Sequence, residues 1–170
     1  MVHIQRIAEA LVYLHSLNVI HRDLKSRNVL LDSTKGTKLT DFGVSKEDME
    51  ATMTMGVGTF RWMAPEVIKS HKYSVASDIY SFGVILTEFA THLIPYSEEI
   101  NPENGQRLGD MPIVVKVVAG ELTPALGTKC PEWVRLLAMD CLKYDPSTRP
   151  TALQLSHRIR TYLRQEYSVV

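Results

Sequence analysis

Two oxygen-bearing side chains stand at the ends of a predicted β-hairpin and could together hold a metal ion. Asn28 precedes the extended residues 29–31, and Asp41 follows the extended residues 38–39. Turn-forming residues lie between the two extended pieces, so the chain is expected to fold back and bring Asn28 and Asp41 to face one point. Amide and carboxylate oxygens are hard ligands of the kind that Mg²⁺ takes in proteins. The pattern therefore predicts a magnesium site at this pair.

Two further side chains in the same segment could act beside such an ion. Asp23 could accept the proton of a hydroxyl group, and Lys25 could place an ammonium group beside a transferring phosphoryl group. A positioned base, a divalent metal and a cation are the groups that phosphoryl transfer requires.

The elements that must position these groups are mostly helical. Apolar residues recur with the helical period over residues 4–15, and residues 74–90 form a second strongly helical stretch. Prolines near helix starts predict further helices over residues 65–68, 112–118 and 131–142, and Thr151 is expected to cap a last helix that runs to residue 163. Extended pieces are expected at 19–20, 29–31 and 38–39, with long loops at 45–57 and 92–111. The predicted fold class is mainly α with a small β-hairpin.

Composition narrows the class of protein. The chain has 170 residues, of which 45% are hydrophobic and 22% are charged, which is typical of a soluble globular domain or a large piece of one. With 19 basic and 19 acidic residues it lacks the positive field of a nucleic-acid binder. Its apolar runs are too short to span a membrane, and no secretory signal is visible. Cys130 and Cys141 fit a reduced, cytoplasmic location.

Several short motifs surround the candidate residues in a fixed order. They are H-R-D-L-K-S-R-N at 21–28, D-F-G at 41–43, G-T-F-R-W-M-A-P-E at 58–66, S-D-I-Y-S-F-G at 77–83 and D-P-S-T-R-P at 145–150. Together they resemble the C-terminal lobe of a eukaryotic protein kinase, and the resemblance covers essentially the whole chain. It implies a kinase-like lobe, part of an α+β domain, over residues 1–165 and a C-terminal tail over 166–170.

The resemblance implies ATP and Mg²⁺ as cofactors and a protein as substrate. Asp23 would be the catalytic base, Lys25 would contact the γ-phosphate, and Asn28 and Asp41 would hold the magnesium ion. Leu30 would lie under the adenine ring.

The resemblance also implies supporting roles, each tied to one motif. Thr59 would close the substrate platform against the base, and Asp78 would accept backbone N–H bonds from the loop around His21 and Arg22. The other implied features are a stack of the His21 ring on Phe42, the motif glycine Gly43, and a buried ion pair between Glu66 and Arg149.

The loop over residues 45–57 contains Thr52 and Thr54, and either could be phosphorylated by an upstream activating kinase. A phosphate there would pair with Arg22 and order the loop. The alternative is that both are ordinary loop threonines.

Two sets of motif residues bear on the kinase class, and they resemble different classes. Lys25 and the Gly58-Thr59 pair resemble serine/threonine kinases, whereas R-W-M-A-P-E at 61–66 resembles tyrosine kinases. This mixture is typical of the tyrosine-kinase-like group, most of which phosphorylate Ser or Thr, and dual specificity is the remaining alternative.

The sequence departs from a full kinase domain in one respect. It contains no G-x-G-x-x-G motif, and the strand lysine and regulatory-helix glutamate of the family, which lie upstream, are also missing. We therefore expect an N-terminal lobe to be absent, the isolated chain to be weakly active or inactive, and Leu30, Leu31 and Phe42 to be exposed. The alternative function is a non-catalytic interaction module built from a kinase lobe.

Overall fold

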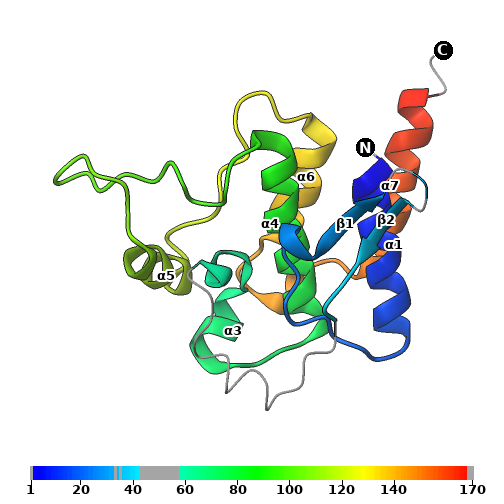
Figure 1. Ribbon diagram of the computed structural model, residues 1–170, viewed down its shortest axis with the longest axis horizontal. Coiled ribbons are helices and arrows are strands. Elements are labelled where there is room, and N and C mark those ends of the chain that lie inside the picture. The colour runs from blue at the N-terminus through cyan, green and yellow to red at the C-terminus, as the bar shows by residue number, and fades with distance from the viewer. Residues whose placement is uncertain (1, 33, 35, 43–57, 168–170) are drawn as a thin grey trace.

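The computed structural model describes residues 2–32, 34, 36–42 and 58–167 (Figure 1). The α-helices are α1 (Val2–Ser16), α3 (Pro65–Ser70), α4 (Val75–Thr91), α5 (Asp110–Ala119), α6 (Glu132–Cys141) and α7 (Ala152–Tyr167). Strands β1 (Val29–Asp32) and β2 (Gly36–Leu39) form a two-stranded sheet, and short 3₁₀ helices cover η1 (Ser26–Asn28), η2 (Thr59–Trp62) and η3 (Pro146–Thr148). The predicted fold class, mainly α with a small hairpin, is confirmed.

Helix α4 is the central element of the core. Every residue from 77 to 87 is buried, because α1, α6 and η2 pack around this helix. A capping box begins the helix, in which Ser74 and Ser77 exchange backbone and side-chain hydrogen bonds. Gly83 lets α6 approach closely, since a Cβ atom at this position would lie 2.7 Å from the Cβ of Cys141.

Helices α1 and α7 pack side by side and cover the other part of the core (Figure 1). The fully buried side chains Ile7 and Leu11 come from α1, and Leu155 and Ile159 come from α7. Helix α1 follows the predicted periodicity, and both helices place their buried apolar residues on one face.

The hairpin lies against α1 through β2. Its register pairs Val29 with Leu39 and Asp32 with Gly36. Leu30 and Leu31 of β1 are 51% and 60% exposed, and Phe42 just after β2 is 53% exposed. The hairpin therefore presents an apolar surface to solvent.

Some boundaries differ from the sequence expectation. Helix α5 begins at Asp110 instead of Pro112, which is permitted because the N–H groups of a first helical turn have no partner within the helix. Residues 19–20 form no strand, and the expected loop over 92–111 contains a β-bridge between Ile100 and Arg107. Helix α7 continues to Tyr167 and so enters the predicted tail.

Among the residues described, none of the helices combines the length and the hydropathy needed to cross a membrane.

Candidate active site

The segment that carries the candidate base is fixed to α4 by one buried carboxylate. Asp78 Oδ2 accepts the backbone N–H of His21 at 2.8 Å, and Oδ1 accepts that of Arg22 at 3.1 Å. The ring Nε2 of His15 in α1 lies 2.9 Å from Asp78 Oδ2. Arg22 has a positive φ of 71°, a conformation that persists in a non-glycine residue only where the surroundings hold it. Asp78 therefore sets the backbone geometry just before Asp23.

Asp23, Lys25 and Asn28 are brought together as the sequence pattern predicts. Lys25 Nζ donates to both carboxylate oxygens of Asp23, at 3.0 and 2.7 Å. The 3₁₀ helix η1 turns the chain back, so that Asn28 Nδ2 donates to the Asp23 backbone oxygen at 2.8 Å and to its Oδ2 at 3.1 Å. The carboxylate of Asp23 is thus held by an amide on one side and an ammonium group on the other.

The hairpin joins Asp41 to this group through its neighbour Thr40. The Thr40 backbone N–H donates to Asn28 O at 3.0 Å, and the Thr40 hydroxyl lies 3.3 Å from Asp41 Oδ2. Because the Nδ2 atom of Asn28 donates to Asp23, the Oδ1 atom of Asn28 is directed elsewhere. No hydrogen bond to this oxygen is found within the described residues.

This donor set fits a magnesium ion that completes its shell elsewhere. An unengaged amide oxygen on Asn28 and an exposed carboxylate on Asp41 are hard ligands, and Mg²⁺ commonly takes one or two protein oxygens with water and phosphate oxygens. No cluster of three or more His, Cys, Asp or Glu residues suited to a metal occurs in the part of the chain that the structure describes.

His21 connects the two halves of the site. Its ring is fully buried, and neither ring nitrogen has a hydrogen-bond partner within the described residues. The ring meets Phe42 edge-on, with centroids 6.3 Å apart. Burial lowers the pKa of His21 against the opposing influence of Asp78, so the ring is neutral near pH 7.

A second contact system fixes the segment around Thr59. The Ser81 hydroxyl of α4 donates to the Trp62 backbone oxygen at 2.7 Å. Glu88, also of α4, accepts the Trp62 indole N–H at 2.7 Å and the Ser26 hydroxyl at 2.8 Å. One helix therefore holds η1 and η2 together. Beside them lies a hollow of about 390 Å³ that Lys25 and Thr59 both line.

The expected ion pair between Glu66 and Arg149 is present and forked. The two Arg149 terminal nitrogens donate to the two Glu66 oxygens at 2.6 and 2.8 Å. Arg149 also donates to the backbone oxygens of Lys143, Ala76 and Tyr144 and lies 5.0 Å above the Tyr80 ring. It thereby ties α3 to α4 and to the segment before α7.

Three predicted site residues, Gly43, Thr52 and Thr54, lie outside the described residues. The pairing of Arg22 with a loop phosphate therefore stays a prediction, as does the adenine contact of the exposed Leu30.

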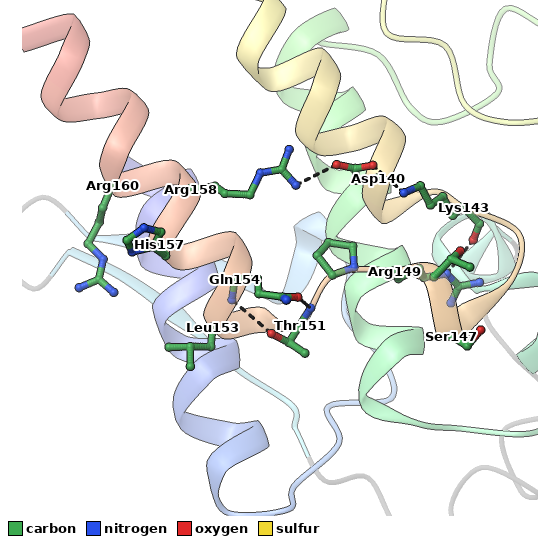
Figure 2. A pocket seen from close by; sticks show the side chains of 12 residues that line it. Asp140, Lys143, Ser147, Arg149, Thr151, Leu153, Gln154, His157, Arg158 and Arg160 are labelled. Atoms are coloured by element: carbon green, nitrogen blue, oxygen red, sulfur yellow. Dashed lines mark hydrogen bonds and ion pairs between the residues drawn. The ribbon is translucent and has the colours of Figure 1, made fainter.

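A larger hollow of about 920 Å³ lies elsewhere, between the end of α6, η3 and the start of α7 (Figure 2). In Figure 2, Arg158 and Lys143 point toward Asp140, and their nitrogens lie 2.8 Å from its oxygens. Arg149 is the one predicted site residue in its lining, and its guanidinium group is engaged by Glu66. This hollow is therefore separate from the residues that could do chemistry.

Sequence reasoning missed His15, Ser26 and Glu88 as parts of the site. Glu88 carried a usable signal, because it is a charged residue within the otherwise apolar run of α4. His15 and Ser26 carried none, since their partners are distant in sequence and become neighbours only after folding.

Comparison with known proteins identifies the class to which this fold and site belong. The family model for the protein kinase domain matches residues 2–159, so the chain belongs to the protein kinase family.

Similar proteins come from animals and plants. The chain is 38% identical over 165 residues to a putative mitogen-activated protein kinase kinase kinase 7-like protein of Drosophila melanogaster, covering 94% of this chain and 39% of the relative. It is 38% identical over 156 residues to human mitogen-activated protein kinase kinase kinase 11, covering 85% and 17%. It is 33% identical over 160 residues to the serine/threonine-protein kinase STY17 of Arabidopsis thaliana, covering 94% and 26%. The chain thus spans well under half the length of these relatives.

Proposed function

We propose that residues 1–165 form the C-terminal lobe of a serine/threonine protein kinase of the tyrosine-kinase-like group, with 166–170 as a tail. The reaction is transfer of the ATP γ-phosphoryl group to a Ser or Thr hydroxyl of a protein substrate. The observation that carries the proposal is the Asp23 carboxylate, held by Lys25 and Asn28 on a loop that Asp78 anchors. The name of the Arabidopsis relative, a serine/threonine-protein kinase, supports the serine/threonine class.

The proposed roles follow from which atoms are already engaged. Asn28 Oδ1 and the Asp41 carboxylate hold Mg²⁺, which when bound neutralises charge on the nucleotide phosphates. Asp23 orients the substrate hydroxyl and accepts its proton, while the Lys25 ammonium group lies beside the same carboxylate and close to the incoming phosphoryl group. Leu30 contacts the adenine ring.

The surrounding residues position and regulate this machinery. Thr59 lines the platform on which the substrate lies, next to Lys25. We also propose that an upstream kinase phosphorylates Thr52 or Thr54, that Arg22 binds the phosphate, and that the protein acts in the cytoplasm.

The second candidate is a non-catalytic module that binds other proteins through this lobe. The exposed apolar side chains Leu30, Leu31 and Phe42 favour it, because a patch of this kind is typical of interaction surfaces. The isolated chain is expected to turn over ATP weakly or not at all under either proposal, so activity of the chain alone does not separate them.

Calorimetric titration of the chain with ATP, with and without Mg²⁺, separates the two. The enzyme proposal predicts binding that requires Mg²⁺ and is lost in Asp41→Asn, whereas Asp110→Asn, outside the proposed metal site, retains it. Binding of ATP that is equal with and without Mg²⁺, or no binding, would favour the interaction module.

A further inference from the structure

The hollow of about 390 Å³ beside the candidate base has charged walls, and these charges are not equally available to a ligand. Its lining includes three cations, Lys25, Arg27 and Arg61, and two anions, Glu88 and Asp110. Lys25 is bonded to Asp23, so a peptide lying in this hollow passes directly beside the base.

Two of the three cations already have partners. Lys25 Nζ is paired with the Asp23 carboxylate at 2.7 Å. Arg61 donates to Asp110 Oδ1 at 2.7 Å and to the Pro95 backbone oxygen at 2.6 Å. Both would have to give up good contacts to bind a charged ligand.

The anions of the lining are also engaged. Asp110 is paired with Arg61. Glu88 accepts one hydrogen bond on each of its oxygens, from Ser26 and Trp62, and burial raises its pKa. A carboxylate that is partly desolvated and already hydrogen-bonded has little remaining capacity to attract a basic side chain.

Arg27 differs from all of these. It is exposed, and it makes no ion pair or side-chain hydrogen bond with any residue in the ranges that the structure describes. Its backbone is nevertheless fixed, because it lies in η1 between Ser26, which is bonded to Glu88, and Asn28, which is bonded to Asp23. A rigid backbone thus presents a guanidinium group that is available to a ligand.

We propose that Arg27 selects substrate segments that carry an anionic side chain near the acceptor hydroxyl, either a carboxylate or a phosphorylated residue. This inference rests on the proposed kinase function and names the substrate class for the same site. A guanidinium group suits such ligands, because its N–H groups form paired hydrogen bonds with carboxylate and phosphate oxygens. Since Arg27 is exposed and screened by solvent, the expected preference is about two- to fivefold for a carboxylate and larger for a phosphate.

The test measures binding of labelled peptides to the full chain by fluorescence anisotropy, so it does not depend on turnover. Each peptide carries one serine acceptor, with glutamate, phosphoserine, glutamine or arginine placed in turn at each neighbouring position. Glutamate and phosphoserine peptides are expected to bind more tightly than glutamine peptides, and arginine peptides more weakly. Added salt should reduce these differences.

Two charge-reversal variants separate a local effect from a general one. Arg27→Glu is expected to invert the order, so that arginine peptides bind best. Arg160→Glu changes the net charge by the same amount at an exposed position on α7 outside this hollow, and it should leave the order unchanged.

Three results would overturn the inference: no binding of any peptide, an order that survives Arg27→Glu, or an equal loss in Arg160→Glu. A preference for arginine peptides that disappears in Glu88→Gln would also overturn it and assign the selectivity to Glu88. This peptide-binding test and the ATP titration can fail independently of each other. A peptide preference that depends on Arg27, found together with an absence of magnesium-dependent ATP binding, would contradict the kinase function but leave the proposed peptide-binding site in place.

Discussion

Asp78 in the first turn of α4 accepts the backbone N–H of His21 at 2.8 Å, and this bond ties the loop of the candidate base to the most buried helix of the described structure. Asp78 is only 1% exposed, and its other carboxylate oxygen accepts the N–H of Arg22. The packing of the core therefore fixes the position of Asp23.

Replacing this anchor should destabilise the fold. Asp78→Asn removes the charge and one acceptor and leaves buried N–H groups of the loop poorly satisfied. We expect a loss of about 1.5–3 kcal/mol in the free energy of unfolding, measured by urea denaturation. Glu98→Gln, which removes a charge from an exposed pair with Arg107, should change it by less than about 1 kcal/mol. Equal effects of the two changes would refute the anchoring role.

The forked pair of Arg149 and Glu66 should be worth more than a surface ion pair. The Arg149 side chain is fully buried, so Glu66→Gln leaves its charge without a counterion. The expected loss is about 3 kcal/mol or more in the free energy of unfolding. The same measurement on Arg107→Gln gives the surface reference, for which about 0–1 kcal/mol is expected. A loss for Glu66→Gln within the surface range would show that the pair is dispensable.

The substitution Gly83→Ala is expected to destabilise the fold, although the same change in most helices is stabilising. In a helix interior, Gly→Ala normally stabilises by up to about 1 kcal/mol. Here the added methyl group would lie 2.7 Å from Cys141 Cβ and 3.1 Å from Leu142 Cγ, so Gly83→Ala should destabilise by about 1–3 kcal/mol. Thermal unfolding followed by circular dichroism measures this. A higher midpoint for the variant would mean that α4 and α6 do not pack this closely.

His21 should make stability depend on pH near neutrality. Burial lowers its pKa below the ordinary value of 6.5, although Asp78, Asp23 and Asp41 act in the opposite direction. The unfolded chain therefore binds more protons than the folded one, and the free energy of unfolding falls as the pH drops through about 6.5, until the lower pKa of the folded state is passed.

The variant His21→Phe, which keeps an aromatic ring next to Phe42, should remove this dependence. Urea denaturation at a series of pH values measures it, and His157→Gln, at an exposed position on α7, serves as the control that retains the slope. A slope that persists in His21→Phe would assign the effect to another group.

The sequence predicts most of the helices and strands. It predicts a side-chain contact between two elements only where both residues of the contact belong to recognised motifs. The periodicity of residues 4–15 locates α1 because that helix buries one apolar face, and the helical stretch of residues 74–90 locates α4, which is buried all round from residue 77 to residue 87. The meeting of Asp23 with Asn28 follows from their closeness in sequence. The bridge from Glu88 to Ser26 and Trp62 does not, since it depends on how α4 packs against η1 and η2.

The beginning of α5 shows a limit of local signals. Proline fits any position of the first helical turn, so Pro112 marks the start of a helix without fixing its first residue. In the same way, Thr151 correctly marks the start of α7, where its hydroxyl accepts the Gln154 N–H, but no comparable signal marks the end of that helix.

The central claim is that Asp23 serves as the base of a phosphoryl transfer. The most direct measurement joins this chain to the N-terminal lobe of a relative such as human mitogen-activated protein kinase kinase kinase 11 and follows transfer of labelled phosphate from ATP to a serine peptide. We expect turnover that Asp23→Asn reduces by about 10²–10⁴-fold, while Glu103→Gln, at an exposed position outside the site, retains it. Turnover that is unchanged in Asp23→Asn would contradict the account.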